Sequence, residues 1–439
     1  MEIALVYIVF LGVIFITFYK PEISLSILLN INIFRAIPYV DYQNPRYGYY
    51  NENDVLLGAT LPLLCFIIII IKVLIKKKIK YKIDKLDVFM VLLSLIMLVS
   101  VLASPRKLIS FNYTVVFLFL AAPFFFVTKL YFSNVKDKDK SLIIFITSIV
   151  FFATFFSIES LYLHSIAQYP YERMTFPGVY PIPFCLFLCL AIIIIIVYYI
   201  RPQIKTDFSK KAKRLFSLAT MAIIAYAIIK TNTRGPVFAM ILSFVLVLTI
   251  FFRIKFNLKI ILASFFALIA GLTTLFTLFD VNEIATRFIN LMPKNKEADS
   301  FASRIDTYID SLRIFINKPF GISVGTFKEY LTGLNLNHRV DPYAHNLFLE
   351  LISSFGVFGL LFSLLLIFLC LNEYNFIVKN QNKIFSKPHF FLIIVIMLFF
   401  FFETQFSFTL NTHKGWYLSM ALYSVYKWDF IKQQQSNET

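Results

Sequence analysis

Long apolar runs, separated by short polar segments, follow one another along most of the 439-residue chain. Many of these runs approach the roughly 20 residues that a helix needs to cross the hydrocarbon core of a bilayer. Because the bilayer core offers the backbone no water, we expect the spanning elements to be α-helices. The pattern predicts an all-α, polytopic integral membrane protein with twelve or thirteen transmembrane helices, in which residues 1–439 form a single transmembrane domain. The short run at residues 22–34, which contains Asn30 and Asn32, leaves that count open.

The polar segments between the runs differ in charge in an alternating way. The Lys/Arg-rich segments are residues 76–85, 136–140, 201–214, 253–259 and 379–387. The positive-inside rule places such short basic loops in the cytoplasm. The intervening segments then face outward: residues 35–54, 105–112, 157–178, 231–235 and 280–344.

Composition agrees with this class and limits the partners. Hydrophobic residues make up 59% of the chain, and 53 residues are Phe, which would leave a soluble globule coated in apolar surface. The net charge of +17 could indicate nucleic acid, but the excess lies in the predicted cytoplasmic loops. Anionic membrane lipids and insertion orientation explain it there, so we expect no nucleic-acid partner. The first run has no small-residue cleavage site after it and is expected to stay as a helix.

The outward segment at residues 280–344 is too long and too patterned for a plain linker. Its apolar residues Ile305, Ile309, Leu312 and Phe315 recur at helical spacing. Ser303 with Asp306 fits the start of a helix, and Lys318-Pro319 fits its end. We expect an amphipathic helix against the membrane surface, so this loop is partly helical.

Two arginines lie at outward positions next to apolar runs. Arg304 falls in the first turn of the predicted amphipathic helix, where its guanidinium and the free backbone N–H groups could bind one phosphate. Taken alone, this residue favours the alternative, an arginine that snorkels or pairs with Asp306. Arg234 lies in a tight turn, where a charge near hydrocarbon costs about 2.5 to 3.5 kcal/mol unless it has a partner. Functional and structural readings of Arg234 both stay open.

His345 opens the next apolar run and is followed by Asn346 and Glu350. A neutral histidine at the water boundary can accept a proton from a sugar hydroxyl. An interfacial histidine bonded to backbone is the alternative. We prefer a buried hydrogen-bond network with Asn346 to a catalytic role for Glu350. We also expect Asn346 and Glu350 to contact the substrate.

Four segments together resemble the O-antigen ligase and polymerase family, bacterial membrane glycosyltransferases that handle undecaprenyl-diphosphate-linked glycans. The segments are ERMTFPGVYPIPF, TNTRGPVF, SRIDTYIDSLRIFINKPFGISVGTF and AHNLFLELISSFGVFGLL. The resemblance implies a fold of the lipid-dependent glycosyltransferase type. It also implies an active site on the extracytoplasmic side of the bacterial inner membrane.

The resemblance also implies roles for particular residues. The family's arginines hold the donor's diphosphate and its histidine assists the acceptor hydroxyl, which assigns catalysis to Arg234, Arg304 and His345. Arg173 is carried over to donor binding, although Pro-Ile-Pro stands where Pro-Asn is usual in that segment. Tyr308 fills an aromatic position after the outward arginine and is assigned to substrate binding.

The chemistry implied is a glycosyl transfer with fixed cations around the leaving diphosphate. Such cations stabilise the negative charge that grows on the leaving oxygen. Because Arg stays protonated and binds phosphate in a bidentate manner, it allows a reaction without metal. The sequence contains no Asp-rich cluster or His/Cys spacing typical of Mg²⁺ or Zn²⁺ sites. We therefore expect neither a metal nor a cofactor.

Polymerase and ligase differ in the acceptor. A polymerase would extend another lipid-linked glycan, whereas a ligase would deliver the glycan to lipid A core, as in lipopolysaccharide assembly; polymerase is slightly favoured. A flippase for the same lipid-linked sugar is the alternative of a different class, but transporters usually show internal repeats, which we do not detect here. A non-catalytic scaffold is a third possibility.

Overall fold

The computed structural model describes residues 2–37, 56–76, 79–166, 173–177, 179–200, 208–252, 300–334, 343–407 and 409–438. The described chain is helical throughout its regular elements. Before the long outward segment these are α1 (Glu2–Tyr19), α2 (Pro21–Leu29), α3 (Ile31–Ala36), α4 (Leu61–Leu74), α5 (Lys85–Ala103), α6 (Lys107–Val116), α7 (Pro123–Asn134), α8 (Lys138–Ile166), α9 (Pro181–Ile194), α10 (Phe208–Thr231) and α11 (Gly235–Phe252). Then follow α14 (Ser300–Asn317), α15 (Phe327–Thr332), α16 (Leu347–Phe355), α17 (Val357–Lys379), α18 (Gln381–Phe385), α19 (Pro388–Glu403) and α20 (Lys414–Glu438). Within these described ranges, three π-helical turns continue neighbouring helices: η2 (Leu56–Thr60), η3 (Phe117–Ala121) and η4 (Ile195–Ile200).

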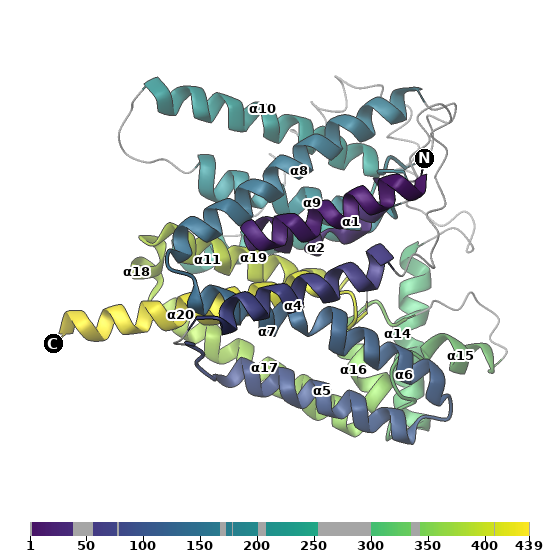
Figure 1. Ribbon diagram of the computed structural model, residues 1–439. Helices are drawn as coiled ribbons and strands as arrows, with labels where there is room; N and C mark the ends of the chain where they lie inside the picture. Colours follow the sequence, from purple (N-terminus) through teal and green to yellow (C-terminus); the bar gives the residue numbers. More distant parts are fainter. Residues whose placement is uncertain are drawn as a thin grey trace, which may run out of the picture.

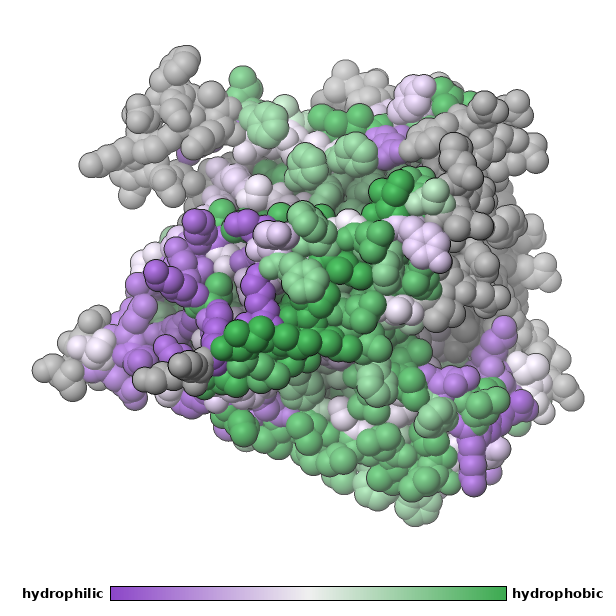
Figure 2. All heavy atoms as spheres, viewed as in Figure 1, coloured by the Kyte–Doolittle hydropathy of each residue, from purple (hydrophilic) through white to green (hydrophobic). Residues whose placement is uncertain are grey.

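The long helices lie side by side in one bundle, with the two chain ends at opposite ends of it (Figure 1). Within the described residues, seven helices are long and apolar enough to cross a membrane, and three more apolar helices are shorter. Apolar side chains also cover the outside: Leu364 and Phe368 on α17 are 54% and 56% exposed. Figure 2 shows hydrophobic residues over the middle of the bundle. The prediction of an all-α polytopic membrane protein is confirmed.

The count of twelve or thirteen spans includes chain outside the described residues, at 253–299. The uncertain segment at residues 22–34 forms two short helices, α2 and α3, that meet at Asn30. The amide of Asn30 donates to the carbonyl of Ser26 at 2.9 Å, so its polar side chain is satisfied within its own segment.

One end of the bundle carries α18, the C-terminus and the turn before Lys138; we call it the basic end. Figure 2 shows hydrophilic residues gathered there. The Lys138 ammonium pairs with Asp429 on α20, and Lys76 donates to the Asn134 carbonyl at 3.0 Å. By the positive-inside rule this is the expected cytoplasmic end.

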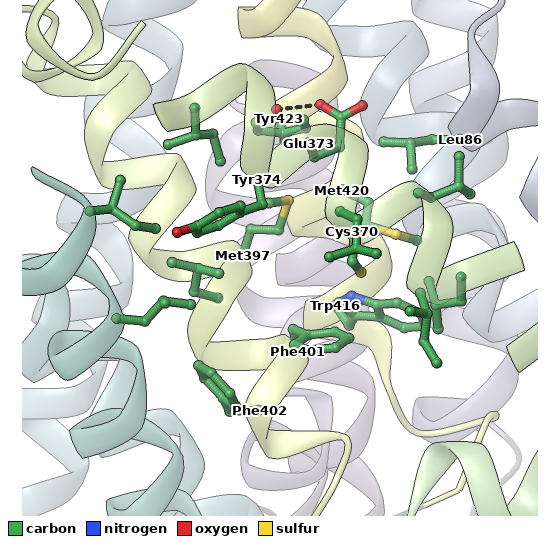
Figure 3. Close-up of a pocket in the computed structure, with 18 of the residues that line it drawn as sticks. Leu86, Cys370, Glu373, Tyr374, Met397, Phe401, Phe402, Trp416, Met420 and Tyr423 are labelled. Carbon is green, nitrogen blue, oxygen red and sulfur yellow. Dashed lines mark hydrogen bonds between the residues drawn. The ribbon is translucent and has the colours of Figure 1, made fainter. Parts of the chain in front are cut away.

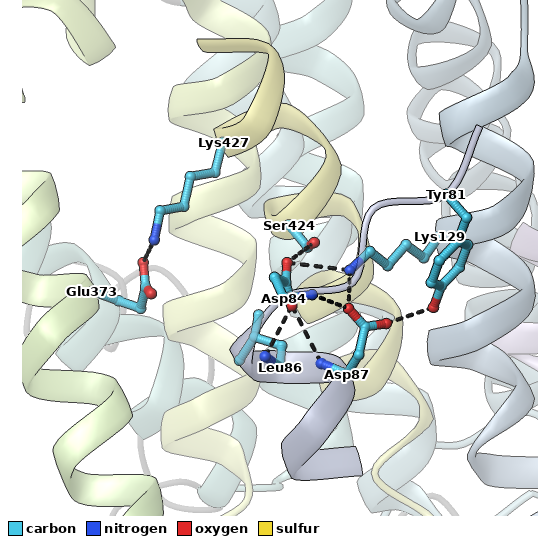
Figure 4. A network of polar contacts seen from close by, with 8 residues as sticks. All are labelled: Tyr81, Asp84, Leu86, Asp87, Lys129, Glu373, Ser424 and Lys427. Carbon is cyan, nitrogen blue, oxygen red and sulfur yellow. Dashed lines mark hydrogen bonds and ion pairs between the residues drawn. The ribbon is translucent and has the colours of Figure 1, made fainter. Parts of the chain in front are cut away.

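A buried ion cluster ties α5, α7 and α20 together near the basic end (Figure 4). Asp84 caps α5, and its side chain accepts from the Leu86 N–H at 2.9 Å. The ammonium of Lys129 contacts the carboxylates of both Asp84 and Asp87, and Ser424 donates to Asp84. Because a buried charge is tolerated only when it is paired, this cluster fixes how the three helices meet.

The opposite end carries α14 and α15, and we call it the α14 end. In Figure 1, α14 crosses the direction of the long helices there. Its predicted apolar positions face away from the protein: Ile305, Ile309 and Leu312 are 45%, 49% and 49% exposed. This arrangement fits the expected helix at a membrane surface. The helix begins at Ser300, one turn before the expected Ser303, and ends before Lys318 as expected.

The segment after α14 is locked onto the corner between α16 and α17. The Val357 N–H donates to the Pro319 carbonyl at 2.7 Å. Gly321 and Gly356 have φ of 81° and 59°, values that favour glycine. A Cβ on Gly356 would lie 1.9 Å from the Pro319 oxygen, so only glycine allows this approach. The Lys-Pro-Phe-Gly and Ser-Phe-Gly segments of the sequence therefore hold α14 beside α16.

Candidate active site

The chain between α19 and α20 forms a platform at the α14 end. We define the platform as residues 404–407 and 409–413. Its backbone contacts the start of α16, because the Leu347 N–H donates to the Thr404 carbonyl at 3.0 Å. The same segment reaches α11 and α6, so it touches elements that are far apart in the sequence.

His345 and Asn346 lie at the start of α16, against the platform. Asn346 is the N-cap residue, and its side-chain oxygen accepts from the Leu349 N–H at 3.1 Å. Its amide nitrogen donates to the Gln405 side chain at 3.2 Å. His345 has φ of 54°, which is uncommon for a residue other than glycine, and its ring lies 4.3 Å from that of Tyr343. The backbone here is bent so that the imidazole stands just outside the helix.

Glu350 is buried one turn further along α16. Its carboxylate accepts from the Tyr113 hydroxyl at 2.6 Å and from the Leu410 N–H at 3.0 Å. The expected network between Glu350 and Asn346 does not form directly, because each side chain bonds to the platform instead. The reason is geometric: Asn346 is used as a helix cap, while Glu350 faces α6.

Arg234 lies in the turn between α10 and α11, and its side chain is exposed. Its carbonyl accepts from the Phe238 N–H at 2.9 Å, so the residue begins α11. The next residue, Gly235, lies against the platform, since a Cβ there would be 3.1 Å from the Ser407 hydroxyl oxygen. The rings of Phe238 and Phe406 pack edge to face at 5.3 Å. The turn with Arg234 is thus fixed to the platform.

Arg173 lies in a segment that is bonded to the end of α10, next to the turn with Arg234. The Met174 N–H donates to the Lys230 carbonyl at the end of α10, at 3.1 Å. Thr175 then bonds to the carbonyl of Val179 at 2.7 Å, which closes the short segment before α9. The side chain of Arg173 is exposed.

Arg304 lies in the first part of α14 and is half-buried. Tyr308, one turn later, is also half-buried; burial raises the pKa of its hydroxyl, and the positive charge of Arg304 acts in the opposite direction. The helix is held over α16 by a small apolar cluster in which Ile314 and Ala344 are buried. Ala344 directly precedes His345, so this contact links the helix of Arg304 to the histidine.

The structure therefore links the segments that carry the predicted residues through shared supports. The residues next to Arg234 and His345 both contact the platform. The segment of Arg173 is bonded to the end of α10, next to the Arg234 turn. Helix α14 packs on the segment that carries His345. All are at the α14 end, opposite the basic end.

Sequence reasoning missed part of this support. Tyr113 was not singled out, because nothing local marks a tyrosine in an apolar helix as a carboxylate partner. His413 was missed too: its Nδ1 lies 3.8 Å from the Glu403 carboxylate, and both side chains are almost fully buried. Gln405, which bonds to Asn346, follows the apolar run of α19.

The comparison with family models bears on this region. Residues 219–364 match a model described as O-antigen ligase. This match supports membership of the O-antigen ligase and polymerase family. The match covers about a third of the chain, from within α10 to within α17, and it includes every predicted site residue except Arg173. A comparison of the chain with curated proteins found no match.

The matched region supports a membrane glycosyltransferase of the O-antigen ligase type that acts in surface polysaccharide assembly. The match implies a lipid-linked glycan and an acceptor as substrates. Among the described residues, no group of three or more His, Cys, Asp or Glu side chains could hold a metal ion. Metal independence stays a prediction.

Proposed function

We propose that this protein transfers a glycan from undecaprenyl diphosphate to an acceptor hydroxyl at the extracytoplasmic face of the bacterial inner membrane. We propose further that the acceptor is another lipid-linked repeat unit, as in a polymerase, rather than lipid A core. The α14 end would then face outward, in agreement with the charge of the basic end.

The platform is the observation that carries the proposal. Ser407 lies against Gly235, beside Arg234, and Gln405 bonds to Asn346, beside His345. Support from one segment would hold a cation and an imidazole in fixed positions, which is what a transfer between two bound substrates needs.

In the proposed reaction the acceptor oxygen attacks the anomeric carbon of the donor. The bond from that carbon to the diphosphate oxygen breaks, and undecaprenyl diphosphate leaves with the electron pair. Arg234 and Arg304 would bind the diphosphate through bidentate hydrogen bonds, which strengthen as its charge grows. Arg173 would add a further cation at the Arg234 turn.

His345 would take the proton of the acceptor hydroxyl as the new bond forms. The proton then returns to water or to the departing diphosphate, so the imidazole is neutral again for the next turnover. Tyr308 would contact the sugar beside Arg304, and Asn346 would orient the acceptor next to His345. Glu350 would either contact substrate or hold the platform in place, and the stability of Glu350 variants separates these roles.

The direct test incubates purified protein in lipid nanodiscs with an undecaprenyl-diphosphate oligosaccharide. A ladder of longer lipid-linked products without added acceptor is the expected result. Transfer only after addition of lipid A core would instead assign a ligase. Absence of any product with either acceptor would refute the proposed function.

A pair of variants on one helix tests the site. Arg304→Ala should lower kcat by about 10²- to 10³-fold, the usual effect of removing one group that stabilises the transition state. The matched control is Arg313→Ala on the same helix, because Arg313 pairs with Asp310 at 2.7 Å. The control should retain near wild-type turnover. Equal losses in both variants would show that α14 needs its charge for folding, not for catalysis.

A further inference from the structure

A partly open apolar cavity lies between α17 and the helices α11, α19 and α20 (Figure 3). Its volume is about 400 Å³, within the range of sites that hold a small molecule. The lining is almost wholly hydrocarbon and sulfur, including Cys370, Met397 and Met420. A cavity with so few polar groups suits a hydrocarbon chain and excludes a sugar or a free phosphate.

The cavity is elongated along the helices. On α17 its lining extends from Leu366 to Ile377, which at 1.5 Å per residue is about 16 Å. This length is about half of the roughly 30 Å hydrocarbon core of a bilayer. The two methionines are unbranched and flexible, so they can adapt to an irregular, methyl-branched chain.

One end of the cavity reaches the candidate active site. Phe348 lines it and lies two residues after Asn346 on α16. Phe402 lines it as well, two residues before Thr404, whose carbonyl bonds to the start of α16. Figure 3 shows Phe401, Phe402 and Trp416 grouped at this end.

The other end is closed by polar contacts near the basic end. The Tyr423 hydroxyl donates to the Glu373 carboxylate at 2.6 Å, and the Lys427 ammonium pairs with the same carboxylate (Figures 3 and 4). A chain in the cavity would therefore have its head group at the platform and not at the basic end.

We propose that this cavity binds the isoprenoid chain of the lipid whose phosphate groups lie at the platform. The inference rests on the proposed function for the identity of that lipid. It assigns the nearest part of the chain to Phe348 and Phe402 and a more distant part to the α17 lining around Cys370. The walls would then position the diphosphate by fixing the path of the chain behind it.

Cys370 allows a test that does not need turnover. The other three cysteines are buried, so N-ethylmaleimide should modify mainly Cys370, and a Cys370→Ser variant measures the background. The wild-type protein in phosphatidylcholine nanodiscs is labelled with and without undecaprenyl phosphate, and the adduct is followed by intact mass. Labelling should slow about tenfold when this lipid is at about ten times its dissociation constant.

Phosphatidic acid, which has a phosphate but two straight acyl chains, is the control lipid. Equal protection by phosphatidic acid would mean that ordinary lipid fills the cavity, and absence of protection by undecaprenyl phosphate would mean that no substrate chain enters it. Either result overturns the inference. Neither depends on glycosyl transfer, so the outcome is separate from that of the ladder assay.

Two tryptophan variants on α17 extend the test to turnover. Leu366 is buried and lines the cavity, whereas Leu364 is 54% exposed on the outside of the same helix. Leu366→Trp should raise KM for the undecaprenyl donor several-fold and leave kcat unchanged, because it narrows the space for the chain. Leu364→Trp should leave both constants at their wild-type values. An unchanged KM in Leu366→Trp would contradict the inference.

Discussion

Replacing Glu350 tests whether the platform needs the carboxylate that holds it. Glu350→Ala leaves two buried donors without their acceptor: the Tyr113 hydroxyl and the Leu410 N–H, which now bond at 2.6 and 3.0 Å. Each buried, unsatisfied donor costs about 1–3 kcal/mol, so the free energy of unfolding should fall by about 2–6 kcal/mol. Glu350→Gln keeps one acceptor oxygen and should lose about half as much.

The assay compares the unfolding midpoint of each variant with its transfer rate. If Glu350 holds the platform, stability and kcat fall together, because Gln405 and Ser407 no longer support Asn346 and Gly235. Tyr113→Phe then gives a non-additive double mutant with Glu350→Ala, with a coupling energy of about 0.5–3 kcal/mol.

The opposite result would refute this reasoning. If Glu350→Gln keeps wild-type stability but raises KM for the acceptor, the carboxylate contacts substrate, and the platform is held by other groups. Additive effects of the Tyr113 and Glu350 variants would lead to the same conclusion.

Three further predictions concern the fold and the site supports. Lys129→Met should lower the free energy of unfolding by about 3–5 kcal/mol in thermal unfolding, because Asp84 and Asp87 lose the buried cation between them. The control Lys138→Met should cost at most about 1 kcal/mol. Similar losses in both variants would mean that water reaches the ion cluster. Gly356→Ala should weaken the attachment of α14, because its φ is 59° and the new Cβ would clash with the Pro319 oxygen. The control Gly12→Ala should be tolerated, because a Cβ there meets no atom within 4 Å. Equal resistance of the two variants to proteolysis would contradict the role of Gly356 in holding α14. Asn346→Ala should lower the free energy of unfolding by about 0.5–2 kcal/mol, because the helix cap is lost. It should also lower kcat more than Asn346→Asp, which keeps the cap. Equal kcat values of the two variants would show that the cap does not position His345.

Some of the site was predictable because its signals are local. A positive charge in a tight turn between apolar runs marks Arg234, and helical spacing of Ile305, Ile309 and Leu312 marks the helix that carries Arg304. The start of α14 was predicted about one turn too late, at Ser303 and not at Ser300. Several polar residues near this start could begin a helix, so the sequence does not single out one of them. The break at Asn30 was visible only as two polar residues in an apolar run.

The supports of the site depend on contacts between distant parts of the chain. Tyr113 and Glu350 are 237 positions apart, and Asn346 and Gln405 are 59 positions apart. No periodicity links such pairs, because a hydrogen bond forms between whichever groups the packing of helices brings within reach. The cavity beside Cys370 has the same origin, as its walls come from several helices.

The surroundings that each stretch of this chain prefers, hydrocarbon or water, can be predicted from its residues alone. Hydropathy decides which helices enter the hydrocarbon, and the Lys/Arg distribution decides their direction, since both act residue by residue. In contrast, the contacts of the segment after α19 with both the Arg234 turn and the start of α16 depend on how the helices pack. That arrangement follows from close approaches, such as Gly356 on Pro319, that depend on three-dimensional shape and not on composition.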